Sequence, residues 1–213
     1  MILKKSIVQT ITLLAIILNS CKGDVKLNSI LNNEKEKTTL IGSKHILEED
    51  GIQLQLPEDF KRLSIAEYYE VLNQKSNRTK FIIEREELKN VRSLNGNSYV
   101  FFNSKNNSSY YIKTLPYSEI KKEDAQKLLG IIRQNQNEVS KNSKVTFERI
   151  TAKFKSITGA QIFKAVFKAE FTRPKNIKYQ HSYFINSNGK SVLLTLITPK
   201  ELSFDKYIEK MIF

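Results

Sequence analysis

Side chains that could act as nucleophiles or general bases are few in this 213-residue chain. It contains one cysteine, Cys21, and two histidines, His45 and His181. Covalent catalysis by serine or cysteine needs a histidine within reach of the nucleophile and a third group that orients it. No Gly-x-Ser-x-Gly motif and no glycine-rich phosphate loop occurs in the sequence. His181 falls on the apolar face of a predicted strand, residues 177–186, which favours a packed histidine over a catalytic one.

Two groups of carboxylates are the remaining candidates for a metal site. They are Glu48-Glu49-Asp50 and the pair Glu86-Glu87. A calcium-binding EF-hand loop needs alternating oxygen ligands and a late glutamate over 12 residues, and neither group has that spacing. We therefore expect both groups to lie on solvated faces. The sequence predicts no catalytic residue, no bound metal and no cofactor.

Cys21 lies where the longest apolar run of the chain stops. Two lysines, Lys4 and Lys5, precede an apolar run from Ile7 to Leu18, which is the layout of a secretory signal. The run is shorter than the roughly 20 residues that a spanning helix needs. It ends in Leu18-Asn19-Ser20-Cys21, which resembles the bacterial lipobox. This resemblance implies diacylglyceryl attachment to Cys21 and removal of residues 1–20; the alternative is an ordinary signal peptide with a chance cysteine.

The residues after Cys21 predict a flexible tether followed by one domain. Residues 21–39 are polar, and as a flexible coil this segment would hold residues 40–213 about 20–25 Å from the anchor. Removing residues 1–20 removes two lysines and no acid, so the net charge falls from +13 to +11. Because acids interleave with the lysines, we interpret the charge as a solvated surface. Export separates the chain from nucleic acid, and we expect none to bind. Lys22, which is not acidic, follows the cysteine, and by resemblance to the lipoprotein sorting rules of Gram-negative bacteria this favours the outer membrane.

The pattern of residues 40–213 predicts an α+β domain in which a mostly antiparallel sheet is flanked by helices. Alternation, capping and turn signals define the elements. In chain order they are a strand at 52–56, a helix from Ser64, a short strand at 81–84, a hairpin over 98–115, a helix at 118–141, four strands between 144 and 198, and a helix at 204–212. We expect a bulge between Phe147 and Ile150 and a type I′ turn at Asn188-Gly189. The aromatic residues of the 98–115 hairpin could form a binding patch, although cross-strand core packing is the commoner use.

Several short segments of the sequence together resemble the PsbP/Mog1-like family. The matching residues are Leu56-Pro57-Glu58 with Phe60, Gly159, Tyr183-Phe184, Asn188-Gly189 and Leu194-Thr195. The resemblance implies an α/β/α sandwich with an extended antiparallel sheet. Family members include photosystem accessory subunits, a small-GTPase binder and bacterial lipoproteins, so no catalytic residue transfers with it. Residues 79–144 match little of the family pattern.

These observations predict a membrane-anchored, non-enzymatic lipoprotein of the bacterial envelope. Its expected role is that of an accessory or protein-binding module, which would hold another envelope protein through a sheet edge or a helix–sheet groove. An alternative is an enzyme or small-ligand carrier whose site comes from residues 79–144. A third possibility is a structural role in which the basic domain lies against anionic lipid or polysaccharide.

Overall fold

The computed structural model describes residues 40–74, 80–173 and 175–213. Its centre is a seven-stranded antiparallel sheet in the order β3-β4-β5-β9-β8-β7-β6. The strands are β3 (Lys61–Leu63), β4 (Ser98–Asn103), β5 (Ser108–Leu115), β6 (Val145–Ile157), β7 (Ala160–Phe171), β8 (Asn176–Ser187) and β9 (Lys190–Thr198). The predicted α+β class with an antiparallel sheet between helices is therefore confirmed.

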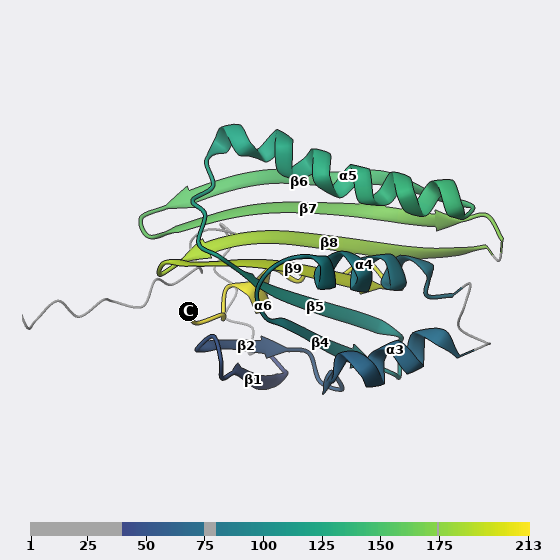
Figure 1. The fold of residues 1–213 in the computed structure, drawn as a ribbon, viewed down its shortest axis with the longest axis horizontal. Coiled ribbons are helices and arrows are strands. Elements are labelled where there is room, and N and C mark those ends of the chain that lie inside the picture. Colours follow the sequence, from purple (N-terminus) through teal and green to yellow (C-terminus); the bar gives the residue numbers. More distant parts are fainter. Residues whose placement is uncertain (1–39, 75–79, 174) are drawn as a thin grey trace, which may run out of the picture.

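Three helices cover one face of the sheet, and a hairpin with a short helix covers part of the other (Figure 1). The first layer holds α3 (Ile65–Asn73), α4 (Ile82–Ser93) and α5 (Ala125–Asn142), the last preceded by the 3₁₀ turn η2 (Lys122–Asp124). The second layer holds β1 (Ser43–Leu47), β2 (Ile52–Leu56) and α6 (Asp205–Ile208). Successive strand residues alternate between these layers, so the central strands supply both halves of the core.

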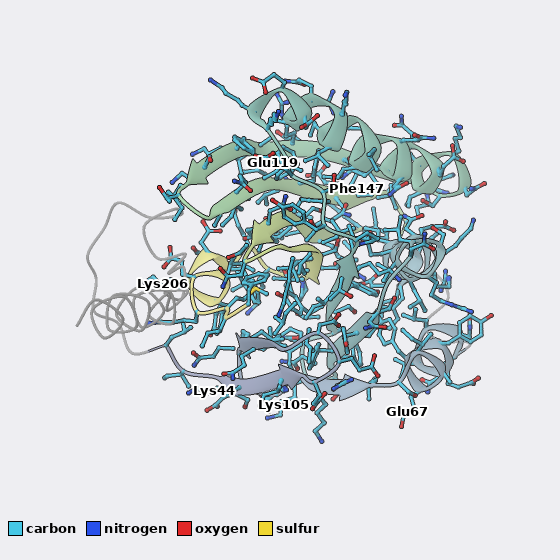
Figure 2. All side chains as sticks on the ribbon, turned by 60° about the vertical axis from the view of Figure 1, so that its left-hand side comes forward. Lys44, Glu67, Lys105, Glu119, Phe147 and Lys206 are labelled. Carbon is cyan, nitrogen blue, oxygen red and sulfur yellow. The ribbon has the colours of Figure 1, made fainter. Side chains whose placement is uncertain are left out.

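Side chains fill the spaces between these layers (Figure 2). Phe147 of β6 points under α5, where it lies beside Phe167 of β7. The labelled charged side chains Lys44 and Glu67 are exposed and point away from the protein. The helix-covered side of the sheet is thus an apolar floor on which α4 and α5 rest.

Local signals in the sequence explain several element boundaries. The Ser64 hydroxyl accepts a hydrogen bond from the Glu67 backbone at 3.2 Å, and the Glu67 carboxylate accepts one from the Ser64 backbone at 2.8 Å, so the predicted capping box begins α3. The register shift in β6 between Arg149 and Thr151 confirms the predicted bulge. Asn188 joins β8 to β9 with a φ of 49°, as a type I′ turn requires.

Two predicted elements are wrong. Residues 81–84 do not form a strand, because Ile83, Glu84 and Glu87 recur on one helical face and belong to α4. The C-terminal helix stops at Ile208 and does not reach residue 212. Instead, the chain becomes extended, and the backbone groups of Ile212 exchange two hydrogen bonds of 2.9 Å with Gln53 of β2. Pairing with the hairpin replaces the last turn of the expected helix.

Candidate functional site

A cavity with a mostly apolar lining lies between α4, α5 and the helix-covered face of the sheet. We call it the helix–sheet pocket; its volume is about 210 Å³. Its wall comes from α5, where Leu128, Ile131, Ile132 and Asn135 recur at i, i+3, i+4 and i+7 and so point to one side of the helix. Sheet residues, including Leu193 of β9, form its floor. Half of its lining residues come from residues 79–144.

The mouth of the pocket is apolar and open to solvent. Leu94, which follows the last turn of α4, is 40% exposed, and Ile131 of α5 is 57% exposed. Both side chains line the pocket. Large apolar residues at the rim of a concave site are a common feature of ligand-binding and protein-binding surfaces.

Glu87 is the acidic side chain of the helix–sheet pocket and is only 7% exposed. Burial raises the pKa of this carboxyl to about 6, and a hydrogen bond from the Thr195 hydroxyl offsets part of the effect. None of the described residues that line the pocket is lysine, arginine or histidine. The pocket therefore combines an apolar wall with a single acidic group.

Two glutamines join α5 to the sheet beside the pocket. The Gln136 amide donates a hydrogen bond of 3.0 Å to the side-chain carbonyl of Gln180, and both residues are buried. Gln180 lines the pocket together with Ser182, its neighbour two positions along β8. Gln136 uses one of the two lone pairs of the Gln180 carbonyl, so this side chain can both accept and donate a further hydrogen bond.

A second buried acid on α4 is paired within the protein. Glu84 lies one turn before Glu87 and forms an ion pair with Lys178 of β8, and both side chains are almost fully buried. Burial is the largest influence on both groups, raising the pKa of Glu84 and lowering that of Lys178. The Lys178 ammonium also donates to the Lys80 carbonyl at 2.7 Å and lies 4.9 Å from the centre of the Phe81 ring. These contacts fasten α4 to the sheet.

Neither histidine belongs to this pocket. His181 lies on the opposite face of β8, is 2% exposed, and makes no hydrogen bond through either ring nitrogen within the described structure. Its prediction as a packed strand histidine is confirmed. His45 of β1 packs against Phe101 with ring centres 4.8 Å apart. The structure therefore does not bring the two histidines to the candidate site, and Cys21 lies outside the described residues.

The expectation that both acidic groups are solvated is only partly correct. Glu48 is exposed and pairs with Arg62, but the Asp50 carboxylate accepts hydrogen bonds from the Tyr99 hydroxyl at 2.5 Å and the Asn97 amide at 3.3 Å. The prediction that Glu87 is solvated is wrong, because its side chain is on the buried face of α4. No group of three or more potential metal-ligating side chains occurs among the described residues.

The aromatic residues of the β4–β5 hairpin pack in the core and do not form a surface patch. All five are at most 8% exposed, and they are Tyr99, Phe101, Phe102, Tyr110 and Tyr111. They divide between the two faces of the sheet, with Phe101 and Tyr110 in the hairpin layer and Phe102 and Tyr111 under α3. Cross-strand packing is thus their role.

The helix–sheet pocket was not predictable as a unit from the sequence. Its polar groups come from α4, α5, β8 and β9, which are far apart along the chain. A glutamate on the apolar side of a helix is the signal that could have identified it. Glu87 follows Ile83 by four residues and precedes Val91 by four, a spacing that places it on the buried stripe.

This protein is similar to known proteins in its fold. No protein-family model matches the sequence, and the comparison with curated proteins gives no match. The solution structure of cyanobacterial PsbP (CyanoP) from Synechocystis sp. PCC 6803 is 13% identical, covers 86% of this chain and 99% of its own, and has a TM-score of 0.53. The Ran-binding protein Mog1p of Saccharomyces cerevisiae is 12% identical over 76% of this chain and 79% of its own, with a TM-score of 0.44.

A third solved structure, the Pseudomonas aeruginosa protein PA94, described as of unknown function and a putative regulator, is 13% identical. It covers 75% of this chain and 83% of its own, with a TM-score of 0.32. At such identities the likeness concerns the fold, and the CyanoP structure carries it because its TM-score is the highest of the three. The chain therefore has the antiparallel α/β/α sandwich fold of PsbP.

Proposed function

We propose that this protein is a lipid-anchored accessory protein of the bacterial cell envelope and that it acts by binding. The anchor is the lipidated Cys21, and residues 22–39 link it to the folded domain. The lipobox-like sequence and the preceding basic and apolar residues support this part of the proposal. Among the described residues, no helix is long and apolar enough to cross a membrane. Two or three acyl chains would give stable attachment without a spanning helix.

The observation that carries the binding role is the open apolar mouth of the helix–sheet pocket. Leu94 and Ile131 stand exposed on opposite elements at the rim, above a cavity of about 210 Å³. A leucine- or phenylalanine-sized side chain of a partner that entered this pocket would contribute about 1.5–3 kcal/mol through burial. A contact of this strength suits an accessory protein that docks reversibly.

Photo-crosslinking in cells tests the docking site. A photoreactive phenylalanine derivative is placed at Ile131, on the rim, and in a control protein at Ile46 of β1. Ile46 is 52% exposed and lies in the layer that covers the opposite face of the sheet. We expect a discrete partner to be captured from position 131 alone and lost when Leu94→Arg places a charge across the mouth. Capture of the same proteins from both positions would refute docking at the pocket.

Cell fractionation tests the anchor separately. Wild-type protein is expected in the membrane fraction and labelled by a supplied fatty acid, whereas the Cys21→Ala protein, which keeps residues 1–20, should carry no label whichever fraction holds it. A Cys21→Ala protein labelled like the wild type would show that acylation does not depend on the thiol. The crosslinking result from position 131 would then still decide the docking proposal independently.

A second candidate function is that of a small-ligand carrier, and Glu87 favours it. A docked apolar side chain needs only an apolar wall, whereas this pocket also holds a buried carboxyl and the amide of Gln180. A few polar groups set in an apolar cavity are typical of sites that orient a small molecule. Capture of no protein from position 131, together with binding of a small probe to the purified protein, would select this function.

A further inference from the structure

Glu84 and Glu87 of α4 form a natural comparison. Both are buried and lie three residues apart on the same helix. Glu84 is neutralised by Lys178, and the positive charge of Arg85 also acts on it. Among the described residues Glu87 forms no ion pair, and the Thr195 hydroxyl donates a hydrogen bond to its carboxylate. The fold thus supplies a counter-ion to one buried acid and none to the other.

The acid without a counter-ion is the one that faces the cavity. A buried carboxylate is costly unless it is paired, and the protein could avoid the cost with a glutamine or a leucine at this position. Such a residue, located in a cavity, is a candidate for ligand binding. A positively charged group entering the cavity would supply the counter-ion that Glu87 lacks.

We propose that the helix–sheet pocket binds an organic ammonium ion, with its cationic head at Glu87 and its apolar body against α5. The proposal rests on the use of this pocket for binding and deepens the small-ligand candidate. Three features of the pocket define the ligand: one acid, no basic residue, and a wall of Leu128, Ile131 and Ile132. An anionic ligand would place two negative charges together in an apolar site.

The size of the cavity limits the apolar body. An apolar cavity of about 150 Å³ is large enough to hold benzene. The helix–sheet pocket, at about 210 Å³, therefore has room for a body of roughly six to eight carbon atoms. Hexylammonium is a suitable probe, because a primary amine remains charged at pH 7.5.

Calorimetric titration of the full-length Cys21→Ala protein tests the proposal with three probes of equal length. At pH 7.5 we expect hexylammonium to bind at least tenfold more tightly than hexanol, and hexanoate to bind most weakly. Glu87→Gln should remove the preference for hexylammonium over hexanol. Glu86→Gln is the matched control, because it removes the same charge from α4 at a residue that is paired with Lys89 outside the pocket.

The pH dependence gives a second readout. With the Glu87 pKa near 6, about one tenth of the carboxyl is ionised at pH 5, so hexylammonium affinity should fall about tenfold between pH 7.5 and pH 5. Glu87→Gln should abolish this fall while the protein remains folded. Hexanol and hexylammonium binding equally to wild type would overturn the inference but leave an apolar binding pocket. If none of the three probes bound, the inference of an ammonium site would also be overturned. Docking of a protein partner would still be decided by the crosslinking from position 131.

Discussion

Replacement of His181 by leucine should make the protein markedly less sensitive to acid. The pKa of His181 is lowered from 6.5 to about 4, chiefly by burial and also by the Lys164 ammonium, while the Asp205 carboxylate acts in the opposite direction. Lys164 and Asp205 are themselves an ion pair of 2.6 Å. The folded protein therefore keeps this ring neutral at pH values where the unfolded chain protonates it.

The sign and size of the effect follow from proton linkage. Because the folded-state pKa of His181 is depressed, its stabilising contribution is present above pH 6.5 and is lost as the pH falls toward 4. At pH 5 the gap of 1.5 pH units from the unfolded pKa corresponds to a loss of about 2 kcal/mol. His181→Leu should remove this loss whatever its effect on stability at neutral pH.

The assay is urea unfolding of the full-length Cys21→Ala protein at pH 7.5 and pH 5.0, followed by circular dichroism. The quantity compared is the change in unfolding free energy between the two pH values. Glu87→Gln should change it in the opposite direction by about 1 kcal/mol, because the raised pKa of Glu87 makes the folded state bind more protons between pH 6 and 4.5. An unaltered pH dependence in His181→Leu would refute the reasoning.

Three further predictions concern stability in urea at neutral pH. Lys178→Met should lose about 3–5 kcal/mol because Glu84 is left buried and unpaired, and adding Glu84→Leu should recover most of it; no recovery would contradict the pairing argument. Gly96→Ala should lower the free energy of unfolding by about 1–3 kcal/mol or more, because φ is +102° and a Cβ would lie 2.0 Å from the Thr114 carbonyl oxygen. Ser64→Ala should cost about 1 kcal/mol with unchanged cooperativity, and a neutral result would mean the cap is replaced by water.

Strands were predictable because alternation and turn residues act locally. The run Val192–Ile197 is apolar on both faces, which predicts a central strand, and β9 is indeed the fourth of seven strands. The alternate positions from Phe163 to Phe171 all face the helices, as their periodicity predicts. In these segments the residue type at each position predicts whether the side chain is buried. The strands could therefore be predicted without knowing their distant contacts.

The helix-covered face was less predictable because its polar residues are satisfied by distant partners. Glu84 looks like a solvent-facing residue until Lys178, more than ninety positions later, is placed opposite it. The same applies to Gln136, which is buried only because Gln180 meets it. Because charged residues lie on the buried face of α4, its apolar periodicity is weak in the sequence. Neither the helix nor the position of Glu87 in the candidate site could therefore be predicted.

The position of β9 has a consequence for how the chain folds. β9 comes last among the strands in sequence, yet it alone joins the β3-β4-β5 part of the seven-stranded sheet to the β8-β7-β6 part. Pairing between β5 and β9 closes a loop of about 80 residues, a non-local step of the kind that slows folding. The two parts of the sheet cannot pair until β9, the last of these strands, has been synthesised. Such delayed closure would leave the β3-β4-β5 part and the β8-β7-β6 part as separate units for most of the time in which the chain folds.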